Sequence, residues 1–259
     1  MLLTAAIVPG PPVFVPELMG SAAHELYDLR DAADSVVSRV VSDLVGSAGA
    51  DPVQLVIVGP GHPGQFNAAG SVSFVSFGRD IVVPALVDHD QRDQGDPEAT
   101  DERALPTPLM VARHLASRDV AAHREHAALW AAARWITTSG SDATDLGEQL
   151  RGDETRIGLI LVADGAACHG PKAPRAEDSR APAYEDAVCE ALASGQGARL
   201  AQIDADLGRV LGATLPEVWP VLVAAADGDW IGELAWRGAP YGVGWAVAAW
   251  HRIPTSAPS

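Results

Sequence analysis

The sequence predicts an α/β protein with a central, mostly parallel sheet that is covered by helices on both faces. Three short apolar runs indicate the sheet, because each has the length and aliphatic composition of a buried strand: residues 2–8, 54–58 and 157–162. A long segment with apolar residues at helical spacing, residues 21–45, follows the first run. No internal repeat or linker divides the chain, so we expect one domain over residues 1–253.

The other elements follow from the same two patterns. Helical spacing or helix-start signals predict helices over residues 107–115, 120–137, 181–193, 197–211 and 216–226. Apolar and β-branched runs predict strands over residues 72–77, 81–83, 230–236 and 244–250, the last two joined by RGAPYGV. The acidic segment 88–103 has no periodicity and is interpreted as a solvated loop, and residues 254–259 as a flexible tail.

Charge and composition exclude several classes of function. Acidic residues outnumber basic ones by 34 to 18, which gives a net charge of −16, so we expect neither nucleic acid nor an anionic membrane surface as a partner. No apolar run is long enough to span a membrane without interruption. The start of the chain lacks the basic segment of a signal peptide, and two cysteines are too few for a disulfide framework. These features predict a cytoplasmic protein.

Functional residues are expected in three loops that follow predicted strands. In open α/β sheets, sites gather beyond the carboxyl ends of the strands. The loops that meet this condition cover residues 9–12, 59–67 and 164–171, and we call them the strand-end loops. The second contains His62 and the third contains His169. An imidazole on such a loop can reach a pocket as a metal ligand or as an acid–base group.

Local patterns alone do not assign a reaction. Cys168 next to His169 would form a nucleophile–base pair only if the fold turned both side chains together, and a buried thiol is the simpler interpretation. His123 and His126 have a spacing compatible with metal binding, although Arg124 and Glu125 between them favour a solvated helix. The motifs of zinc proteases, phosphate-binding loops, dinucleotide-binding loops and serine hydrolases are absent.

Five segments, in order along the chain, carry a family resemblance: IVPGPPVFVPELMG, VIVGPGHPGQFN, LILVADGAACHG, LPEVWPVLVAAADG and APYGVGWAVAAW. They resemble the conserved segments of the class III extradiol ring-cleavage dioxygenase catalytic subunits, the LigB-type superfamily. The resemblance implies an α/β domain that holds one non-haem Fe(II) through two histidines and a carboxylate. It also implies a catecholic substrate, molecular oxygen as co-substrate and a nearby histidine as the acid–base group.

The residues that would carry this chemistry are partly replaced. The first metal-ligand histidine of the family pattern corresponds to Gly10, and the acid–base histidine corresponds to Ala167. His62 lies one place after the second ligand position, His169 lies two places after the acid–base position, and Glu217 matches the late carboxylate. The resemblance therefore implies, at most, a displaced Fe(II) site with His62 and Glu217 as ligands and His169 as the catalytic acid–base residue.

Two other functions remain open at this point. The scaffold can serve as a metal-free module that binds a small aromatic ligand or a protein partner, which the substitutions at Gly10 and Ala167 favour. Alternatively, Cys168 and His169 act as nucleophile and base of a different enzyme. The tryptophans near the C-terminus would suit a homo-oligomer interface, although alternate strand positions would bury some of them in the core.

Overall fold

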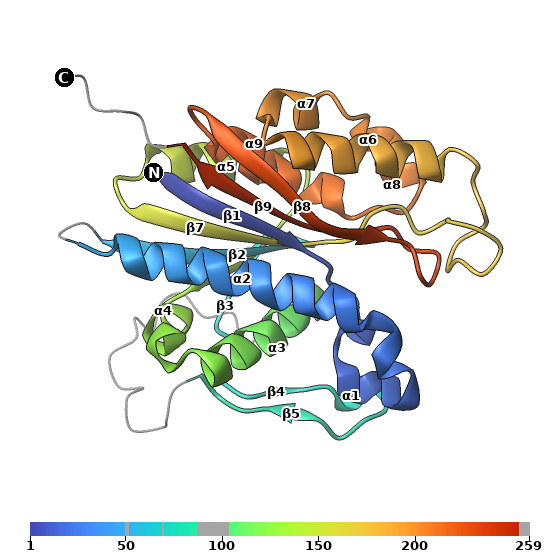
Figure 1. The fold of residues 1–259 in the computed structure, drawn as a ribbon, viewed down its shortest axis with the longest axis horizontal. Coiled ribbons are helices and arrows are strands. Elements are labelled where there is room, and N and C mark those ends of the chain that lie inside the picture. The colour runs from blue at the N-terminus through green and yellow to red at the C-terminus, as the bar shows by residue number, and fades with distance from the viewer. Residues whose placement is uncertain (50–51, 69, 87–103, 254–259) are drawn as a thin grey trace.

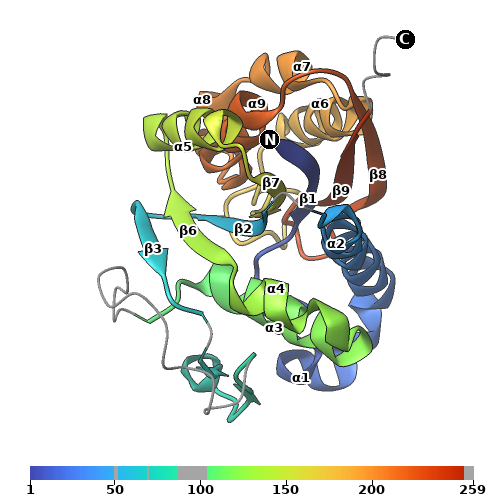
Figure 2. The ribbon, with the colours of Figure 1, turned by 90° about the vertical axis from the view of Figure 1, so that its left-hand side faces the viewer.

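The computed structural model describes residues 1–49, 52–68, 70–86 and 104–253. A seven-stranded sheet lies between two layers of helices (Figure 1). Its strand order is β3-β6-β2-β7-β1-β9-β8, which can be followed across Figure 2. The α/β class and the helices on both faces are therefore confirmed. The expected loop at 88–103 and the expected tail at 254–259 lie outside the described residues.

The sheet is mixed, so the prediction of a mostly parallel sheet is wrong. Its four inner strands are parallel, namely β1 (Leu2–Val8), β2 (Val53–Pro60), β6 (Arg134–Thr138) and β7 (Arg156–Val162). The three outer strands pair antiparallel to their neighbours, namely β3 (Gly64–Phe66), β8 (Trp230–Gly238) and β9 (Trp245–Arg252). The short hairpin between β8 and β9 makes them antiparallel, because parallel pairing needs a long crossover. The chain reverses between β2 and β3, so β3 runs antiparallel to β6, which is itself parallel to β2.

One face of the sheet is covered by α2 (Tyr27–Ser47), α3 (Thr107–Ala122) and α4 (Ala127–Ala131), which lie below the sheet in Figure 1. The helix α2 forms as its apolar spacing predicts, with one buried stripe that includes Leu29, Ala33, Val36, Val37, Val40, Val41 and Leu44. This stripe packs on the sheet together with α3, so the opposite sides of both helices face outward.

The other face is covered by helices from the second half of the chain, which lie above the sheet in Figure 1. They are α5 (Ser141–Gly152), α6 (Ala181–Ser194), α7 (Gly197–Ala201), α8 (Ala205–Val210) and α9 (Trp219–Ala225). The expected single helix at 197–211 is two helices, because Asp204 caps a new helix by accepting a hydrogen bond from the N–H of Leu207 at 2.9 Å. The helix α5 has no counterpart among the predicted elements.

The expected helix at 120–137 is the largest error of the sequence interpretation. The helix α3 ends at Ala122 because His123 adopts a non-helical backbone conformation. A 3-10 turn, Arg124–His126, and the short helix α4 follow before the chain enters β6. Trp130 and Trp135, which both fall within the expected helix, lie on α4 and on β6, and their ring centroids are 6.0 Å apart in the core.

Short elements complete the described chain. The expected strands at 72–77 and 81–83 are reduced to a two-stranded ribbon of β4 (Val72–Ser73) and β5 (Val82–Val83). The N-terminal region contains α1 (Pro16–Met19). The remaining 3-10 turns cover Pro12–Phe14, Gly20–Leu26, Val75–Phe77 and Leu215–Glu217. Among the described residues, no helix combines the length and the apolar character that a membrane crossing requires.

Two buried arginines fasten these outer turns to the helices. Arg113 of α3 has no exposed surface, and its guanidinium donates to the carbonyls of Ala68 at 2.8 Å and Pro84 at 2.5 Å. Burial lowers the pKa of Arg113 to about 10. Arg30 of α2 similarly donates to the carbonyl of Phe14 at 2.7 Å. Each guanidinium satisfies several carbonyls that would otherwise be buried without a partner.

Candidate functional site

The strand-end loops meet at the carboxyl edge of the parallel strands, as expected. The N–H of Gly10 in the first loop donates to Oδ1 of Asp164 in the third loop at 3.1 Å. In place of a side chain at position 10, the start of α3 fills the space. A Cβ added to Gly10 would lie 3.2 Å from Cβ of Pro108 and 3.3 Å from Cγ1 of Val162. A side chain at this position would therefore require Pro108 and Val162 to shift by a few tenths of an ångström.

Glu217, the expected carboxylate ligand, already has two partners. Its Oε1 accepts a hydrogen bond from Nε of Arg209 at 2.6 Å, and its Oε2 accepts one from the N–H of Gly140 at 3.1 Å. The side chain thus ties the turn before α9 to α8 and to the start of α5. This is the role of a structural carboxylate, since both oxygens are engaged by donors.

His62 points to solvent. His62 is exposed, and its backbone carbonyl accepts a hydrogen bond from Oγ1 of Thr137 at 2.6 Å. Within the described residues, His62, His169 and Glu217 form no group of three ligand atoms within 4.8 Å of one another. Gly10 offers no ligand atom either. These residues do not fit the iron centre that the resemblance implies.

His169 lies beside a buried carboxylate, and the cavity next to it is smaller than the small-molecule sites of proteins. Its Nε2 is 3.6 Å from Oε2 of Glu185, and the cavity that both line measures about 140 Å³. Glu185 also accepts a hydrogen bond from the N–H of Ala166 at 3.1 Å. A Cβ at Gly165 or at Gly244 would collide with the Glu185 carboxylate. Glycines at these two positions therefore let this acid hold the third loop against β9.

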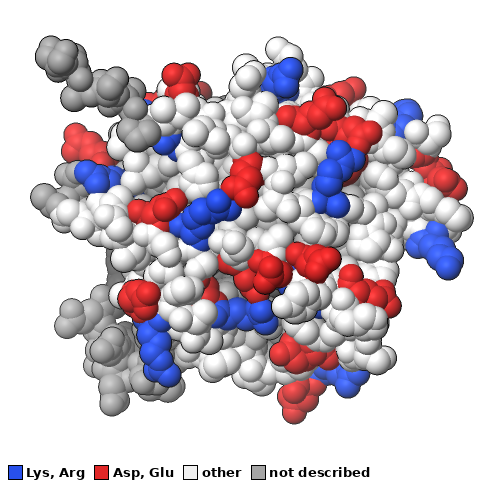
Figure 3. Space-filling view, viewed as in Figure 1, with Lys and Arg blue, Asp and Glu red and all other residues white. Residues whose placement is uncertain are grey.

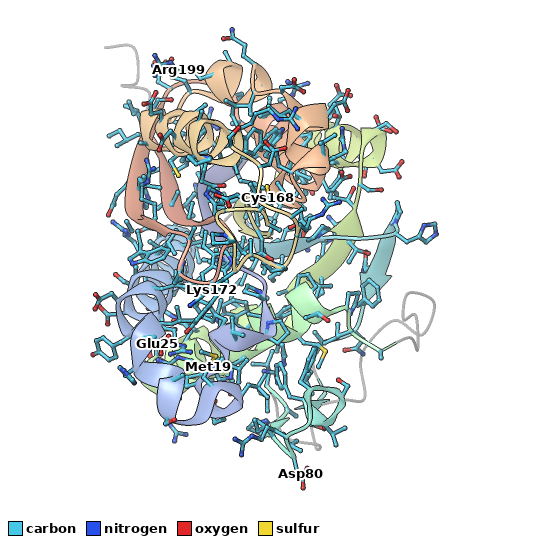
Figure 4. The ribbon with its side chains drawn as sticks, turned by 90° about the vertical axis from the view of Figure 1, so that its right-hand side faces the viewer. Met19, Glu25, Asp80, Cys168, Lys172 and Arg199 are labelled. Carbon is cyan, nitrogen blue, oxygen red and sulfur yellow. The ribbon has the colours of Figure 1, made fainter. Side chains whose placement is uncertain are left out.

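Cys168 has the environment of a structural thiol. It is 2% exposed, and Sγ donates to the carbonyl of Leu211 at 3.3 Å. It is labelled in Figure 4, on the loop that follows β7. Burial is the main cause that raises its pKa, which disfavours the thiolate. The neighbouring His169 contacts Glu185 and not this sulfur, so the Cys168–His169 pair has no support in the structure.

Asp164 is the strongly perturbed carboxyl group of this region. Burial is the main reason that its pKa is raised to about 6; the N–H of Gly10 opposes this shift and the carboxylate of Glu185 adds to it. A carboxyl group with such a pKa exchanges protons near neutral pH. Asp164 lines neither the cavity beside His169 nor the groove described next, however, so no substrate path to it is visible from these cavities.

A groove of about 870 Å³ lies between α2 and α3, on the sheet face opposite α5. Its apolar floor includes the buried side chains of Val37 and Leu115. The remaining lining residues are small or polar: Asp31, Asp34, Ser35, Ser38, Arg39, Ser42, Arg118, Asp119, Ala121, Ala122 and His123. This volume falls in the range of small-molecule sites in proteins.

Ion pairs bridge the elements around the groove. Arg118 of α3 pairs with Asp34 of α2, and Arg39 of α2 pairs with Glu233 of β8 at 2.7 Å. On the face shown in Figure 3, acidic and basic side chains lie side by side in the same way. The groove therefore has no single dominant charge, and its polar groups of both signs suit a neutral or mixed-charge ligand better than a strongly ionic one.

A buried hydrogen-bond chain ends at the groove. Nδ1 of His126 lies 2.8 Å from Oδ2 of Asp119, and its Nε2 lies 3.2 Å from Oγ of Ser42. Nε1 of Trp130 donates to the same Asp119 oxygen at 2.7 Å. Asp119 and His126 are almost fully buried, whereas Ser42 is exposed. The carboxylate fixes the imidazole with Nε2 directed toward the groove.

A second histidine and a carboxylate adjoin this chain. The ring of His123 stacks on that of His126 with centroids 5.0 Å apart, and Nδ1 of His123 is 3.8 Å from Oε1 of Glu125. Among the described residues, these three form the group whose ligand atoms lie within 4.8 Å of one another. The two histidines were noticed from their spacing, but the solvated helix expected around them is a 3-10 turn with His126 buried.

Ser42 and Asp119 were not identified from the sequence as partners of His126. Ser42 lies 84 residues before His126, and only the packing of α2 against α3 brings them together. Asp119 lies on the buried side of α3, and no sequence motif marked it as a partner of His126.

Comparisons with known proteins give no functional assignment. No protein-family model and no curated protein matches this sequence. Solved structures do match, among them that of the uncharacterized protein JW3007 from Escherichia coli K12. It shares 13% sequence identity over 96% of this chain and 99% of that chain, with a TM-score of 0.48. The family and the function of this chain are therefore not established by its relatives.

Proposed function

We propose that this protein binds a small hydroxylated aromatic molecule in the groove between α2 and α3, without ring cleavage. The observation that carries the proposal is the groove itself, whose volume of about 870 Å³ accommodates a ligand of this size. Ala121 and Ala122, which are exposed in the lining of the groove, offer apolar contact to a ring. Ser35, Ser38 and His123 line the same groove and offer hydrogen bonds to its hydroxyl groups.

The proposal excludes ring cleavage because the strand-end loops and Glu217 do not offer a set of free iron ligands. Gly10 supplies no metal ligand, the space beside it is filled by Pro108, and Glu217 is held by Arg209 and the N–H of Gly140. The order of the five resembling segments still favours descent from an extradiol dioxygenase. We infer that the chain is a diverged member of that superfamily in which the scaffold persists and the iron site does not.

A cytoplasmic location belongs to the same proposal. Cys168 and Cys189 are both free and buried, and burial raises the pKa of Cys189 to about 12. Thiols kept in this state are typical of proteins in a reducing compartment.

Catechol binding tests the proposal. Saturation-transfer NMR on the full chain should detect saturable catechol binding. After Fe(II) is added, an oxygen electrode should record no catechol-dependent oxygen uptake above that of the same Fe(II)–catechol mixture without protein. Ser35→Trp, which places an indole at an exposed position of the groove wall, should abolish binding. The matched control Gln149→Trp, exposed on α5 at the opposite face, should bind as wild type does.

Two results would contradict the proposal. One is catechol binding that Ser35→Trp leaves unchanged, or no saturable binding at all. The other is oxygen uptake that depends on Glu217, because that residue lies in the strand-end region and not in the groove.

A further inference from the structure

We infer that His123, Glu125 and His126 form a binding site for a divalent transition-metal ion, at the end of the groove where α3 stops. Two imidazoles and one carboxylate are the donor set of many zinc and non-haem iron sites. One possible ligand atom from each residue, which for a histidine is either ring nitrogen, lies within 4.8 Å of the other two. Because Glu125 is exposed and His123 is half-buried, both side chains can rotate to close these separations around an ion. This inference does not depend on the identity of the aromatic ligand.

The strongest support is the way His126 is held. Metal-bound histidines almost always donate their second ring N–H to a carboxylate or carbonyl, which fixes the ring and makes the ligand nitrogen more basic. Asp119 takes this role at Nδ1 of His126 at 2.8 Å, and is itself held by Nε1 of Trp130 at 2.7 Å. The only ring nitrogen of His126 left for a metal is Nε2, which faces the exposed Ser42.

The local backbone favours a preformed site. The three ligands fall within four consecutive residues, and the 3-10 turn Arg124–His126 is closed by a hydrogen bond from the N–H of His126 to the carbonyl of His123 at 3.0 Å. This turn places both rings in a stack instead of on separate faces. The conformational entropy lost in bringing the two imidazoles together is therefore lost on folding and not on metal binding.

Ser42, His126 and Asp119 also have the hydrogen-bond order of a serine nucleophile with its base and orienting acid. The surroundings of Ser42 do not support that chemistry. It lies inside α2, where backbone N–H groups are used by the helix, so they are not free to stabilise an oxyanion. His123 and Glu125, in contrast, have no role in a serine mechanism and are accounted for by a metal.

Zinc is the ion that this donor set fits best. It accepts imidazole nitrogen and carboxylate oxygen in a tetrahedral site, and three protein ligands leave one position open for water or a ligand group. His123 lines the groove, so this open position would be reached from the same groove. Manganese, magnesium and calcium prefer mainly oxygen ligands and are expected to bind more weakly.

Cobalt(II), which substitutes for zinc and absorbs visible light, provides the test. Tag-free, metal-stripped full-length protein should bind one equivalent of Co(II) with visible absorption bands that added Zn(II) removes. His123→Ala and Glu125→Gln, at accessible positions that are safe for folding, should weaken binding by about 100-fold or more. The matched controls His62→Ala and Glu217→Ala change a histidine and a glutamate outside the site and should bind as wild type does.

Three outcomes would overturn the inference. The first is the absence of saturable Co(II) binding by folded wild-type protein. The second is binding that His123→Ala leaves intact or that His62→Ala abolishes. The third is covalent labelling of Ser42 by a serine-directed fluorophosphonate in the presence of excess zinc, because it would assign Nε2 of His126 to the serine.

Discussion

Replacing Asp164 by asparagine should stabilise the protein at neutral pH and change its stability little in acid. The folded-state pKa of Asp164 is raised from 3.8 to about 6, mainly by burial. The folded state therefore holds a proton that the unfolded state releases between these pH values. Stability falls as pH rises through this window, and the ionised group costs about 3 kcal/mol above it. Asparagine removes this cost and keeps an oxygen that accepts from the N–H of Gly10.

Urea unfolding at pH 4.0 and pH 7.5 measures the effect. The free energy of unfolding of Asp164→Asn should match that of wild type at about pH 4 and exceed it by roughly 3 kcal/mol at pH 7.5, a rise in Tm on the order of 6–12 °C. Asp153→Asn is a control of opposite sign. A hydrogen bond from the N–H of Thr155 lowers the pKa of Asp153. The ionised carboxylate therefore stabilises the folded state at pH values above the ordinary aspartate pKa, and this stabilisation is lost as the pH falls through the lowered pKa. An equal difference between Asp164→Asn and wild type at both pH values would refute the reasoning.

Three further predictions concern the packing around the two regions. Arg113→Met should leave the carbonyls that it serves unpaired and lower the free energy of unfolding by about 3 kcal/mol, measured by urea unfolding; a loss below 1 kcal/mol would show that water replaces the guanidinium. Gly244→Ala should cost about 1–3 kcal/mol through its collision with the Glu185 carboxylate, and a double-mutant cycle with Glu185→Ala should show that the two losses are not additive. Cys168 should react with iodoacetamide far more slowly in the native protein than after unfolding, as followed by mass spectrometry, and equal rates would contradict its burial.

The parts of the fold that were predicted correctly are those with a strong local pattern. β1, β2 and β7 are inner strands, so both of their faces are buried and their sequences are continuously apolar. The helix α2 has one buried stripe over 21 residues, which makes its period unmistakable. The closing hairpin of β8 and β9 was also identified, although its antiparallel pairing was not carried into the prediction of a mostly parallel sheet.

The errors arose where tertiary contacts decide the local structure. The strand β6 has the sequence RWITT, whose β-branched residues pair with β2 and β3, but a preceding helix with similar spacing concealed it. The strand β3 lies in a Gly- and Pro-rich loop and forms because β6 offers it an edge. The same limit applies to the site, since Glu217 was matched by motif while its partners Arg209 and Gly140 come from other elements.

The location of a bound metal tests the central claim, that the functional centre lies in the groove between α2 and α3 and not at the strand-end loops. Anomalous X-ray diffraction from crystals soaked with Co(II) places the metal without any assumption about activity. The account predicts one strong anomalous peak within bonding distance of His123 and His126. A peak beside His62 or Glu217, with none at the groove, would contradict it.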